Sequence, residues 1–458
     1  MAWLWQFGIE AGIDTVGIEV VNKQVGEWIA VDALSQPWLL QLGLAIVSVF
    51  IAEMVRDFYH FMSHQWAPLQ RLHSWHHRAY KKDFSPISTE LYRQAQLYND
   101  APEAIFMMAV LLLLAVVTQA PGLLMGVLYA AGFLLTALGR SRGLLASTDL
   151  THEPGPLSGI PGRWRVNRTY HWRHHFDNTE AYYAGLFPIS DQLLGTALSL
   201  KGKTVAVTGA SGTLGRALIQ ALAKQGARPV ALTTSAAAAI PGAAKVLPWQ
   251  PGQENTLKET FKKIDILVIN HGINTLGDAS YQAVEQSLEV NALSVWRLVE
   301  VFLGTVDNRH GRATKEVWVN TSEAEVSPAF SPVYEISKRL MGDLINLRRT
   351  DAPCVIRKLV LGPFKSQLNP YGVMSAGAIA EMILFLAKRD VRNIIVTINP
   401  FTYVLFPLKE LVQSVYFKLL VKPTKQGADQ WNADQRKAED EGKKVKVSIR
   451  QECLETKE

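Results

Sequence analysis

Cysteine is scarce in this chain of 458 residues, where only Cys354 and Cys453 occur. Cys354 lies in an apolar run and Cys453 in a charged tail, so we expect no disulfide between them, and a reducing compartment fits. Positive charge is also scarce at the start, because no Lys or Arg precedes Lys23. The sequence therefore lacks the charged start of a secretory signal.

A basic stripe interleaved with aromatic residues is missing as well, although the net charge is +6. Nucleic acid is therefore not an expected partner. The hydrophobic share of 48% is unevenly distributed, and the chain is long enough for two or three domains. We expect an N-terminal segment at residues 1–37, a membrane domain at 38–197, a second domain at 201–398, an amphipathic or membrane-associated helix at 399–421 and a charged, disordered tail at 422–458.

Charged residues are absent between Ala104 and Gly139, a stretch too long for one bilayer span. A turn signal at residues 119–122 divides it, so we expect two helices, 104–118 and 123–138, that form a membrane hairpin. Residues 38–55 carry one charge and are about long enough for another span. A helical hairpin buried in a soluble core is the alternative, which the length without charge disfavours.

The charge bias predicts the orientation of these spans. Residues 1–37 contain one Lys and five acidic residues, whereas Arg and Lys accumulate after the first span and again after the hairpin. Under the positive-inside rule both basic stretches face the cytoplasm. We therefore expect a multi-pass integral membrane protein whose second domain also lies on the cytoplasmic side.

Histidine is concentrated in one region, because nine of the eleven histidines fall between His60 and His175. One H-x-x-x-H pair and two H-x-x-H-H clusters place imidazoles on one face of a helix, where they can converge on a metal. This number exceeds the needs of one tetrahedral zinc and predicts two metal ions, with scattered structural histidines as the alternative. The candidate ligands are His60, His64, His73, His76, His77, His152, His171, His174 and His175.

Residues 38–197 resemble the fatty acid hydroxylase/sterol desaturase superfamily of integral-membrane oxygenases. The resemblance is carried by the three histidine clusters in this order, by the charge-free hairpin between them, and by Leu186-Phe-Pro-Ile-Ser-Asp191 before Gly195-Thr196. It implies an all-α membrane domain with two iron ions that activate dioxygen to hydroxylate or desaturate a lipid. Zinc also suits imidazole ligands and would instead imply a hydrolytic or structural role.

One position departs from this superfamily. Some members have a histidine pair before the last cluster, whereas here Thr148 stands four residues ahead of His152. Water, Asn99 or Asp149 are the alternatives for the ligand that Thr148 does not supply.

The second domain begins with a strand at Thr204 to Val207 and the loop Thr208-Gly-Ala-Ser-Gly-Thr-Leu-Gly215, which opens a helix. Glycines in such a loop let the backbone approach a pyrophosphate at the helix N-terminus. Four features follow in order: a strand ending in Asn270-His-Gly272, Asn291 in a helix at 281–303, a strand ending in Ser322 before Tyr334-Glu-Ile-Ser-Lys338, and a strand at 354–361.

This order resembles the short-chain dehydrogenase/reductase family across residues 201–398 and implies an α/β Rossmann-type, doubly wound parallel sheet. The resemblance makes Tyr334 the general acid/base, Lys338 the group that lowers its pKa and holds the ribose, Ser322 the residue that orients the substrate oxygen, and Asn291 the anchor of a proton-relay water. Glu323 is the alternative alignment for the catalytic serine. The implied cofactor-binding residues are Thr208, Gly209, Ser211, Gly212, Thr213, Leu214, Gly215, Asn270, Gly272, Tyr334 and Lys338.

The cofactor is NADP or NAD, with NADP slightly favoured. No acidic residue occurs around Val230 to Ser235, after the second strand, where a ribose 2′-hydroxyl would need one. Arg216 and Ser235 are candidates to lie near a 2′-phosphate, although Arg216 is equally suited to be a solvated helix residue. A nucleotide-free Rossmann-like scaffold is the alternative to a cofactor site.

Residues 401–420 mix apolar residues with Pro407, Lys409 and Glu410. The internal charges and the proline argue against a span, so we expect either an interfacial amphipathic helix or a helix packed against the second domain. His310 lies in a polar stretch and is expected to be an ordinary surface residue.

Together the two halves predict a bifunctional membrane oxidoreductase of lipid metabolism, a di-iron hydroxylase or desaturase fused to an alcohol/carbonyl oxidoreductase. Its substrate would be a fatty acyl, aldehyde, sterol-like or carotenoid-like lipid. The second domain moves hydrides and no flavin motif is evident, so the irons need an external electron donor such as ferredoxin or a small cytochrome. Alternatives are a fatty-aldehyde-processing enzyme of the wax or alkane type, or an oxygenase whose nucleotide domain only docks or senses.

Overall fold

The computed structural model describes residues 37–145, 151–234, 239–307 and 310–421. Among these, residues 37–79 with 88–145 form one compact unit, and residues 80–87 with 151–421 form another. Several sequence expectations fall outside the described residues. These are the segments 1–36 and 422–458 and the residues Thr148, Asp149, Ser235 and Cys453.

The first unit is a bundle of helices with an apolar core around Ala52, Met107, Leu111 and Ala130. A π-helical turn, η2, joins α4 to α5, and a short 3-10 turn, η3, begins the last helix of the bundle. The helices are α2 Trp38–Gln65, α3 Ala67–Arg78, α4 Thr89–Ala95, η2 Gln96–Asp100, α5 Ala101–Thr118, η3 Pro121–Leu123 and α6 Leu124–Ser141.

Three helical stretches of this unit are long and apolar enough to cross a membrane: Trp38–Gln65, Thr89–Thr118 and Pro121–Ser141. The predicted hairpin is confirmed as a pair of packed helices, α5 and α6, and each stretch is longer than predicted. The first helix continues beyond Val55 because its polar residues occupy one buried side. That buried side includes Glu53, Asp57, His60 and Ser63.

The second unit is built on a seven-stranded, wholly parallel sheet with the strand order β3-β2-β1-β4-β5-β6-β7. This confirms the predicted doubly wound α/β fold. The strands are β1 Thr204–Thr208, β2 Arg228–Thr233, β3 Lys245–Pro248, β4 Ile266–Ile269, β5 Glu316–Asn320, β6 Val355–Leu361 and β7 Asn393–Val396.

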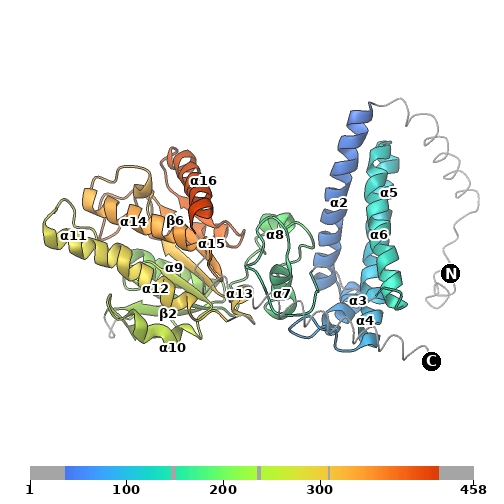
Figure 1. The fold of residues 1–458 in the computed structure, drawn as a ribbon, viewed down its shortest axis with the longest axis horizontal. Helices are drawn as coiled ribbons and strands as arrows, with labels where there is room; N and C mark the ends of the chain where they lie inside the picture. Colours follow the sequence, from blue (N-terminus) through green and yellow to red (C-terminus); the bar gives the residue numbers. More distant parts are fainter. Residues whose placement is uncertain (1–36, 146–150, 235–238, 308–309, 422–458) are drawn as a thin grey trace, which may run out of the picture. The chain divides into compact units, whose positions relative to one another are not determined.

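Helices cover both faces of the sheet (Figure 1). One apolar core lies under α9 and α15, and a second lies under α10, α12 and α14. Strands buried on both faces read as continuous apolar runs, as in β4, Ile-Leu-Val-Ile. The helices are α7 Arg168–Phe176, α8 Ile189–Leu194, α9 Thr213–Lys224, α10 Lys258–Phe261, α11 Tyr281–Leu288, α12 Ser294–Leu303, α13 Gly311–Thr314, α14 Pro332–Arg348, α15 Ala376–Ala387 and α16 Thr402–Leu420.

The predicted helix over residues 281–303 is interrupted by a π-helical turn, η5, at Glu289–Leu293. The turn contains Asn291, which is fully buried. Because π-turns insert one extra residue into a helix, they re-aim the side chains they carry and occur often at functional sites.

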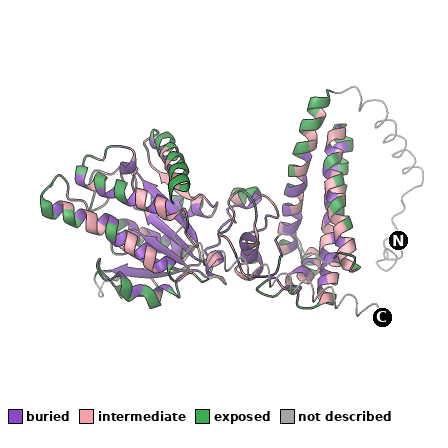
Figure 2. Ribbon diagram, in the orientation of Figure 1, coloured by how far each residue is buried: buried purple, intermediate pink, exposed green. Residues whose placement is uncertain are grey.

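Helix α16 has one buried side and one exposed side. Thr402, Phe406 and Glu410 are buried against the rest of the unit, whereas most other side chains of the helix are exposed (Figure 2). The exposed residues are mainly apolar. They include Tyr403, Val404, Leu405, Leu408, Leu411, Val412, Val415, Tyr416, Leu419 and Leu420.

Candidate metal centre and nucleotide site

Four predicted ligands come together in the first unit, His60 and His64 from α2 and His73 and His77 from α3. Ligand nitrogens of these four side chains lie within 4.8 Å of one another. The Nε2 atoms of His73 and His77 are 2.9 Å apart. The chain bends at Trp66 between α2 and α3, so that the histidine pair of one helix faces the histidine pair of the other.

Asn99 fixes the orientation of His73. Its side-chain oxygen lies 2.8 Å from His73 Nδ1, and its amide nitrogen donates to Asp100 at 2.6 Å. Because the amide oxygen only accepts, Nδ1 of His73 carries the proton and Nε2 keeps its lone pair for a metal. Asn99, which belongs to the π-turn η2, thus supports a ligand in this geometry. His76 lies beside the same turn, with Nδ1 3.7 Å from Asp100 Oδ1.

The pKa of His73 is well below its ordinary value, because the ring is buried and has other imidazoles as neighbours. Those two effects disfavour the charged ring. The neutral imidazole that results is the form that binds metals.

Three further predicted ligands converge in the second unit. The Nε2 atoms of His171 and His152 are 2.9 Å apart, those of His171 and His175 3.1 Å, and those of His152 and His175 3.2 Å. His171 and His175 are one turn apart on α7, and His152 comes from the loop before it. His174, on the same helix, has Nδ1 2.8 Å from the carbonyl oxygen of Ala181.

These distances fit a shared ion. Two nitrogens held at about 2.1 Å from one metal and at right angles lie about 3 Å apart. Hydrogen bonding alone explains this arrangement poorly. Each hydrogen bond needs one protonated and one unprotonated nitrogen, and three Nε2 atoms that all face one point cannot satisfy this for every pair. The rings of Tyr80 and Phe84 pack on His152, with centroids 4.6 Å and 5.2 Å away, which limits water around this group.

The predicted pyrophosphate loop, residues 208–215 (the phosphate loop), lies at the carboxyl end of β1. It lies beside the end of β4, at the point in the sheet where the chain switches from one direction of strand addition to the other. Thr208 Oγ1 accepts the backbone N–H of Asn270 at 2.9 Å, which ties the two strand ends together. Gly209 has φ +59°, and a Cβ at Gly215 would lie 2.2 Å from the carbonyl oxygen of Gly209. Glycine therefore lets α9 approach the loop. Ser211, Gly212, Thr213 and Leu214 complete the turn into this helix.

The predicted catalytic residues come together at the same edge of the sheet. Lys338 Nζ donates to the carbonyl oxygen of Asn320 at 3.2 Å and lies 5.7 Å from the ring centroid of Tyr334. Burial raises the pKa of Tyr334, and the side chain of Ser322 opposes this rise. Burial lowers the pKa of Lys338 to about 8, although Glu325 opposes the shift.

Asn291 reaches the same neighbourhood from the π-turn η5. Its side-chain oxygen accepts from the backbone N–H of Ile273 at 2.8 Å, and its amide donates to the carbonyl oxygen of Ile273 at 2.9 Å. A Cβ at Gly272 would lie 3.0 Å from Asn291 Oδ1 and 3.8 Å from Lys338 Nζ. Gly272 therefore leaves the space in which these two groups approach each other.

Ser322 and Glu323 have different neighbours. Ser322 opposes the rise in the pKa of Tyr334, whereas Glu323 accepts hydrogen bonds from Thr397 at 2.6 Å and Thr402 at 3.4 Å. The carboxylate of Glu323 thus connects β7 and α16 to the loop after β5.

Arg216 connects the phosphate loop with the segment that follows β2. Its Nε donates to the carbonyl oxygen of Ser211 at 2.9 Å and its Nη1 to that of Ala239 at 3.0 Å. The side chain is exposed and bridges the phosphate loop to the segment after β2. A guanidinium in this place suits the prediction that a 2′-phosphate binds nearby.

Sequence reasoning did not assign a role to His271 or His310. His271 is buried between Thr208 and Ser294, with ring nitrogens 2.9 Å and 3.3 Å from their hydroxyls, and burial lowers its pKa to about 3. It is a neutral structural residue under the phosphate loop. His310, expected at the surface, is half-buried, and its ring stacks on that of Trp172 at 4.9 Å. These contacts join residues far apart in the sequence, so no local sequence pattern could have predicted them.

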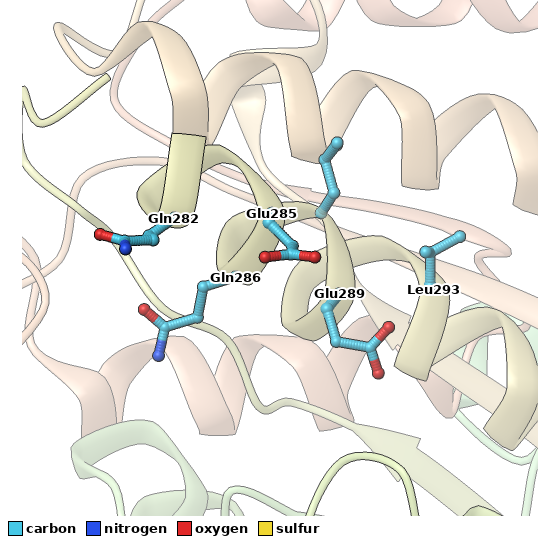
Figure 3. A pocket seen from close by; sticks show the side chains of 6 residues that line it. Gln282, Glu285, Gln286, Glu289 and Leu293 are labelled. Carbon is cyan, nitrogen blue, oxygen red and sulfur yellow. The ribbon is translucent and has the colours of Figure 1, made fainter. Parts of the chain in front are cut away.

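A separate pocket of about 430 Å³ opens on α11 and the turn after it (Figure 3). Its lining includes Glu285, Glu289 and Leu293, and none of the predicted catalytic or cofactor-binding residues belongs to it. The pocket therefore lies apart from the catalytic residues.

Both halves of the chain match known families. The family described as "Fatty acid hydroxylase" matches residues 45–196, and the "NAD dependent epimerase/dehydratase family" matches residues 205–341. A protein of Synechocystis sp., named monoglucosyldiacylglycerol epimerase, is 51% identical over 408 residues, which cover 85% of this chain and 100% of the relative. The chain belongs to this family of fused proteins. Membership implies iron as the metal and a nicotinamide nucleotide as the cofactor.

Solved structures of dehydrogenases resemble part of the chain. A short chain dehydrogenase from Burkholderia cenocepacia in complex with NADP is 18% identical, with a TM-score of 0.40, over 49% of this chain and 100% of that one. Aldohexose dehydrogenase of Thermoplasma acidophilum, in ligand-free form, is 17% identical, with a TM-score of 0.36, over 43% of this chain and 93% of that one.

Proposed function

We propose that this protein inverts a secondary alcohol in the sugar headgroup of a glucosyl diacylglycerol. The observation that carries the proposal is the 51% identity with a relative of that name over the whole length of the relative. The arrangement of Ser322, Tyr334 and Lys338 supports it, because these groups serve alcohol–carbonyl interconversion.

Inversion at a carbinol carbon is chemically simple if the carbon is first oxidised. When bound, a nicotinamide would supply reversible hydride transfer at this carbon, so removal from one face and return to the other would consume no net electrons. Tyr334 takes the hydroxyl proton as the ketone forms and gives it back as the alcohol reforms. Lys338 stabilises the tyrosinate, and Ser322 holds the substrate oxygen in both directions.

The segment between β6 and α15 supports a substrate that has to turn between the two hydride transfers. This segment contains no helix and exposes Tyr371 and Val373, which are 92% and 68% accessible. We propose that it covers the substrate, and a short, open cover would leave room for the ketone to present its other face.

Lipid access is part of the proposal. The three apolar helices indicate membrane association, and we propose that the helices span the bilayer with the histidine clusters and the nucleotide domain on the cytoplasmic side. The exposed apolar side of α16 would lie in the membrane interface and keep the nucleotide domain near glycolipid headgroups.

The histidine clusters support a second activity in the first half of the chain. We propose that these residues hold two iron ions, which supply oxidation of an unactivated C–H bond when dioxygen and electrons are provided. Asn99 and the carbonyl of Ala181 orient His73 and His174 for this task. An external one-electron donor such as a ferredoxin or a small cytochrome is still expected, and the lipid would be an acyl chain of the same membrane.

Headgroup inversion is tested with the purified full-length protein, glucosyl diacylglycerol in vesicles and a small amount of NAD⁺ or NADP⁺ under argon. We expect the epimeric glycolipid to form with no added reductant. A requirement for dioxygen, an accumulating ketone as the end product, or carbon loss from an acyl chain would contradict the proposal. A non-catalytic docking role for the nucleotide domain would likewise predict no inversion.

The metal assignment is tested by elemental analysis of the same preparation. About two irons per chain are expected after anaerobic loading with Fe²⁺ and removal of free metal. Stoichiometric zinc that iron does not displace would contradict the oxygenase activity and leave the epimerase proposal standing.

A further inference from the structure

Helix α7 carries its metal ligands on one side and an arginine on the other. With about 100° per residue, His171 and His175 lie about 40° apart around the helix axis, and Arg173 lies about 160° from either. Arg173 is nevertheless buried, with 2% of its surface exposed. The back of the ligand helix is therefore anchored in the protein interior.

The nucleotide domain supplies the partners of Arg173. The Nε atom donates to the carbonyl oxygen of Ala313 at 2.6 Å, and Nη2 donates to Glu316 Oε1 at 3.1 Å. Ala313 belongs to α13, and Glu316 is the first residue of β5. The guanidinium also lies 5.6 Å from the ring centroid of Tyr182. Arg173 thus bridges the histidine helix to the amino-terminal edge of the central strands.

Glu316 is itself held rigidly. Arg357 Nε donates to Oε2 at 2.8 Å and Nη2 to Oε1 at 3.0 Å, while the indole of Trp318 donates to Oε2 at 3.0 Å. Arg357 in turn donates to Asp390 at 2.8 Å. Two guanidiniums therefore face two carboxylates in a buried network. Burial would raise the pKa of Glu316, but Arg357 and Arg173 hold it at about 2.

Two further contacts fasten the chain on either side of α7. Lys203, next to β1, bonds Asp177, which directly follows α7, at 2.6 Å. Arg392, next to β7, donates to the carbonyl oxygen of Pro161 at 2.6 Å. The histidine helix is therefore held by the nucleotide domain at three places along the amino-terminal edge of the sheet.

We propose that Glu316 is a positioning residue of the metal centre, so that the nucleotide domain forms a structural part of the site that holds the irons. This inference rests on the proposed metal-binding function of His152, His171 and His175. Metal ligands need placement within about 0.5 Å and 10–20°. Without the carboxylate, the buried Arg173 would lose its counter-charge, and the helix would shift to bring the guanidinium to water.

The test compares the wild type with Glu316→Gln in the full-length protein, loaded anaerobically with Fe²⁺ and titrated with a competing chelator. Mutation of residues that support metal ligands typically weakens metal affinity about 10–100-fold. We expect a loss in this range at the site on α7, with NAD(P)⁺ affinity unchanged. Equal iron affinity in wild type and variant would overturn the positioning role.

A matched control comes from another buried carboxylate of the same domain. Glu254 pairs with Arg297 at 3.0 Å and accepts from the backbone N–H of Gly252 at 2.9 Å, and both partners lie outside α7. Glu254→Gln should lower the melting temperature but leave iron affinity at the wild-type value. If Glu254→Gln weakens iron binding as much as Glu316→Gln, the effect is general destabilisation and the proposal is wrong.

A second variant decides the question if Glu316→Gln does not fold. Arg173→Lys keeps the positive charge but loses the hydrogen bond to Ala313 and the planar fork, so iron affinity should fall about tenfold. In the Arg173→Lys, Glu316→Gln double variant the two losses of iron affinity should not multiply, because both substitutions disrupt the same Arg173–Glu316 contact. Multiplying losses, or unchanged affinity in Arg173→Lys, would overturn the inference. A wild type that binds no iron at all would instead contradict the proposed metal function.

Discussion

Tyr334 is the residue on which the proposed alcohol chemistry depends. Ser322 opposes the rise in its pKa that burial causes, and the ammonium of Lys338 lies 5.7 Å from its ring centroid. The Tyr334→Phe variant keeps the packing of the ring but cannot take or return a proton. We expect the inversion rate to fall about 10²–10⁴-fold with NAD(P)⁺ affinity retained, measured by product formation and cofactor titration. Tyr281→Phe, at an exposed tyrosine, is the control and should behave as wild type.

Lys338 predicts the pH dependence of the reaction. Because burial lowers its pKa to about 8, its ammonium is lost as the pH rises through that value. The positive charge that stabilises the tyrosinate disappears with it, so kcat/KM should decrease above about pH 8. Lys338→Arg stays charged in this range, and its alkaline decrease should vanish even if its rate is lower. An unchanged alkaline limb in Lys338→Arg would show that another group titrates.

Local spacing made most of these residues recognisable. Helical periodicity relates His171 to His175 and Tyr334 to Lys338, so a sequence pattern is enough to predict their shared face. The pairing of Arg173 with Glu316 has no such signal, because 143 positions separate the two residues. Only the packing of α7 on the sheet edge brings them together.

At the scale of elements, the entry into α9 depends on Gly215. A Cβ there would lie 2.2 Å from the carbonyl oxygen of Gly209, so Gly215→Ala should push the helix away from the phosphate loop. We expect NAD(P)⁺ affinity to fall at least about tenfold in fluorescence titrations. Gly377→Ala, in α15 with no atom within 4 Å of the new Cβ, is the control and should bind cofactor normally.

Helix α16 provides a test of membrane docking. Leu411 and Val415 are 62% and 50% exposed on its apolar side. Glutamate at both positions should lower activity on vesicle-borne glycolipid about tenfold, because charges do not enter the membrane interface readily. Activity on detergent-dispersed substrate should stay unchanged. The control is Met382→Glu at an exposed position of α15, which should change neither the vesicle activity nor the detergent activity. If the α16 double variant is as active on vesicles as the wild type, docking through α16 is refuted.

The helices and strands were predictable where the apolar periodicity is strong. They were less predictable where π-turns or buried polar residues interrupt that periodicity. The helical hairpin followed from apolar runs and a turn signal, and the doubly wound parallel sheet followed from the resemblance to the short-chain dehydrogenase/reductase family. The π-turns that carry Asn99 and Asn291 were not predictable, because an extra residue in a helix leaves the overall pattern intact. The length of α2 was underestimated because buried polar residues end the apolar run before the helix ends.

At the scale of the whole molecule, the sequence domains and the compact units differ. Residues 151–197 were assigned to the membrane domain from the histidine pattern, yet they pack with the nucleotide-binding sheet. Buried ion pairs such as Lys203–Asp177 and Arg173–Glu316 account for this arrangement. Sequence patterns indicate which residues belong to a family motif, whereas buried ion pairs join segments that lie far apart in the sequence.

The two edges of the sheet have different tasks in this account. Glu316 begins β5 at the edge that anchors α7, and Ser322 follows the other end of the same strand. Five strand residues at about 3.3 Å each separate the edges by about 16 Å. The anchor of the histidine helix therefore lies at the opposite end of β5 from Ser322, and we expect the proposed headgroup inversion and the proposed metal chemistry to be separable steps.

The most direct measurement follows the hydrogen on the inverted carbon. Glucosyl diacylglycerol carrying deuterium on the carbinol carbons of the sugar is incubated with the pure protein in light water, under argon and without reductant. If one hydride is removed and returned at the same carbon, the epimer retains all of its deuterium. Replacement of deuterium by solvent hydrogen at the inverted carbon, or no inversion without dioxygen, would contradict the account.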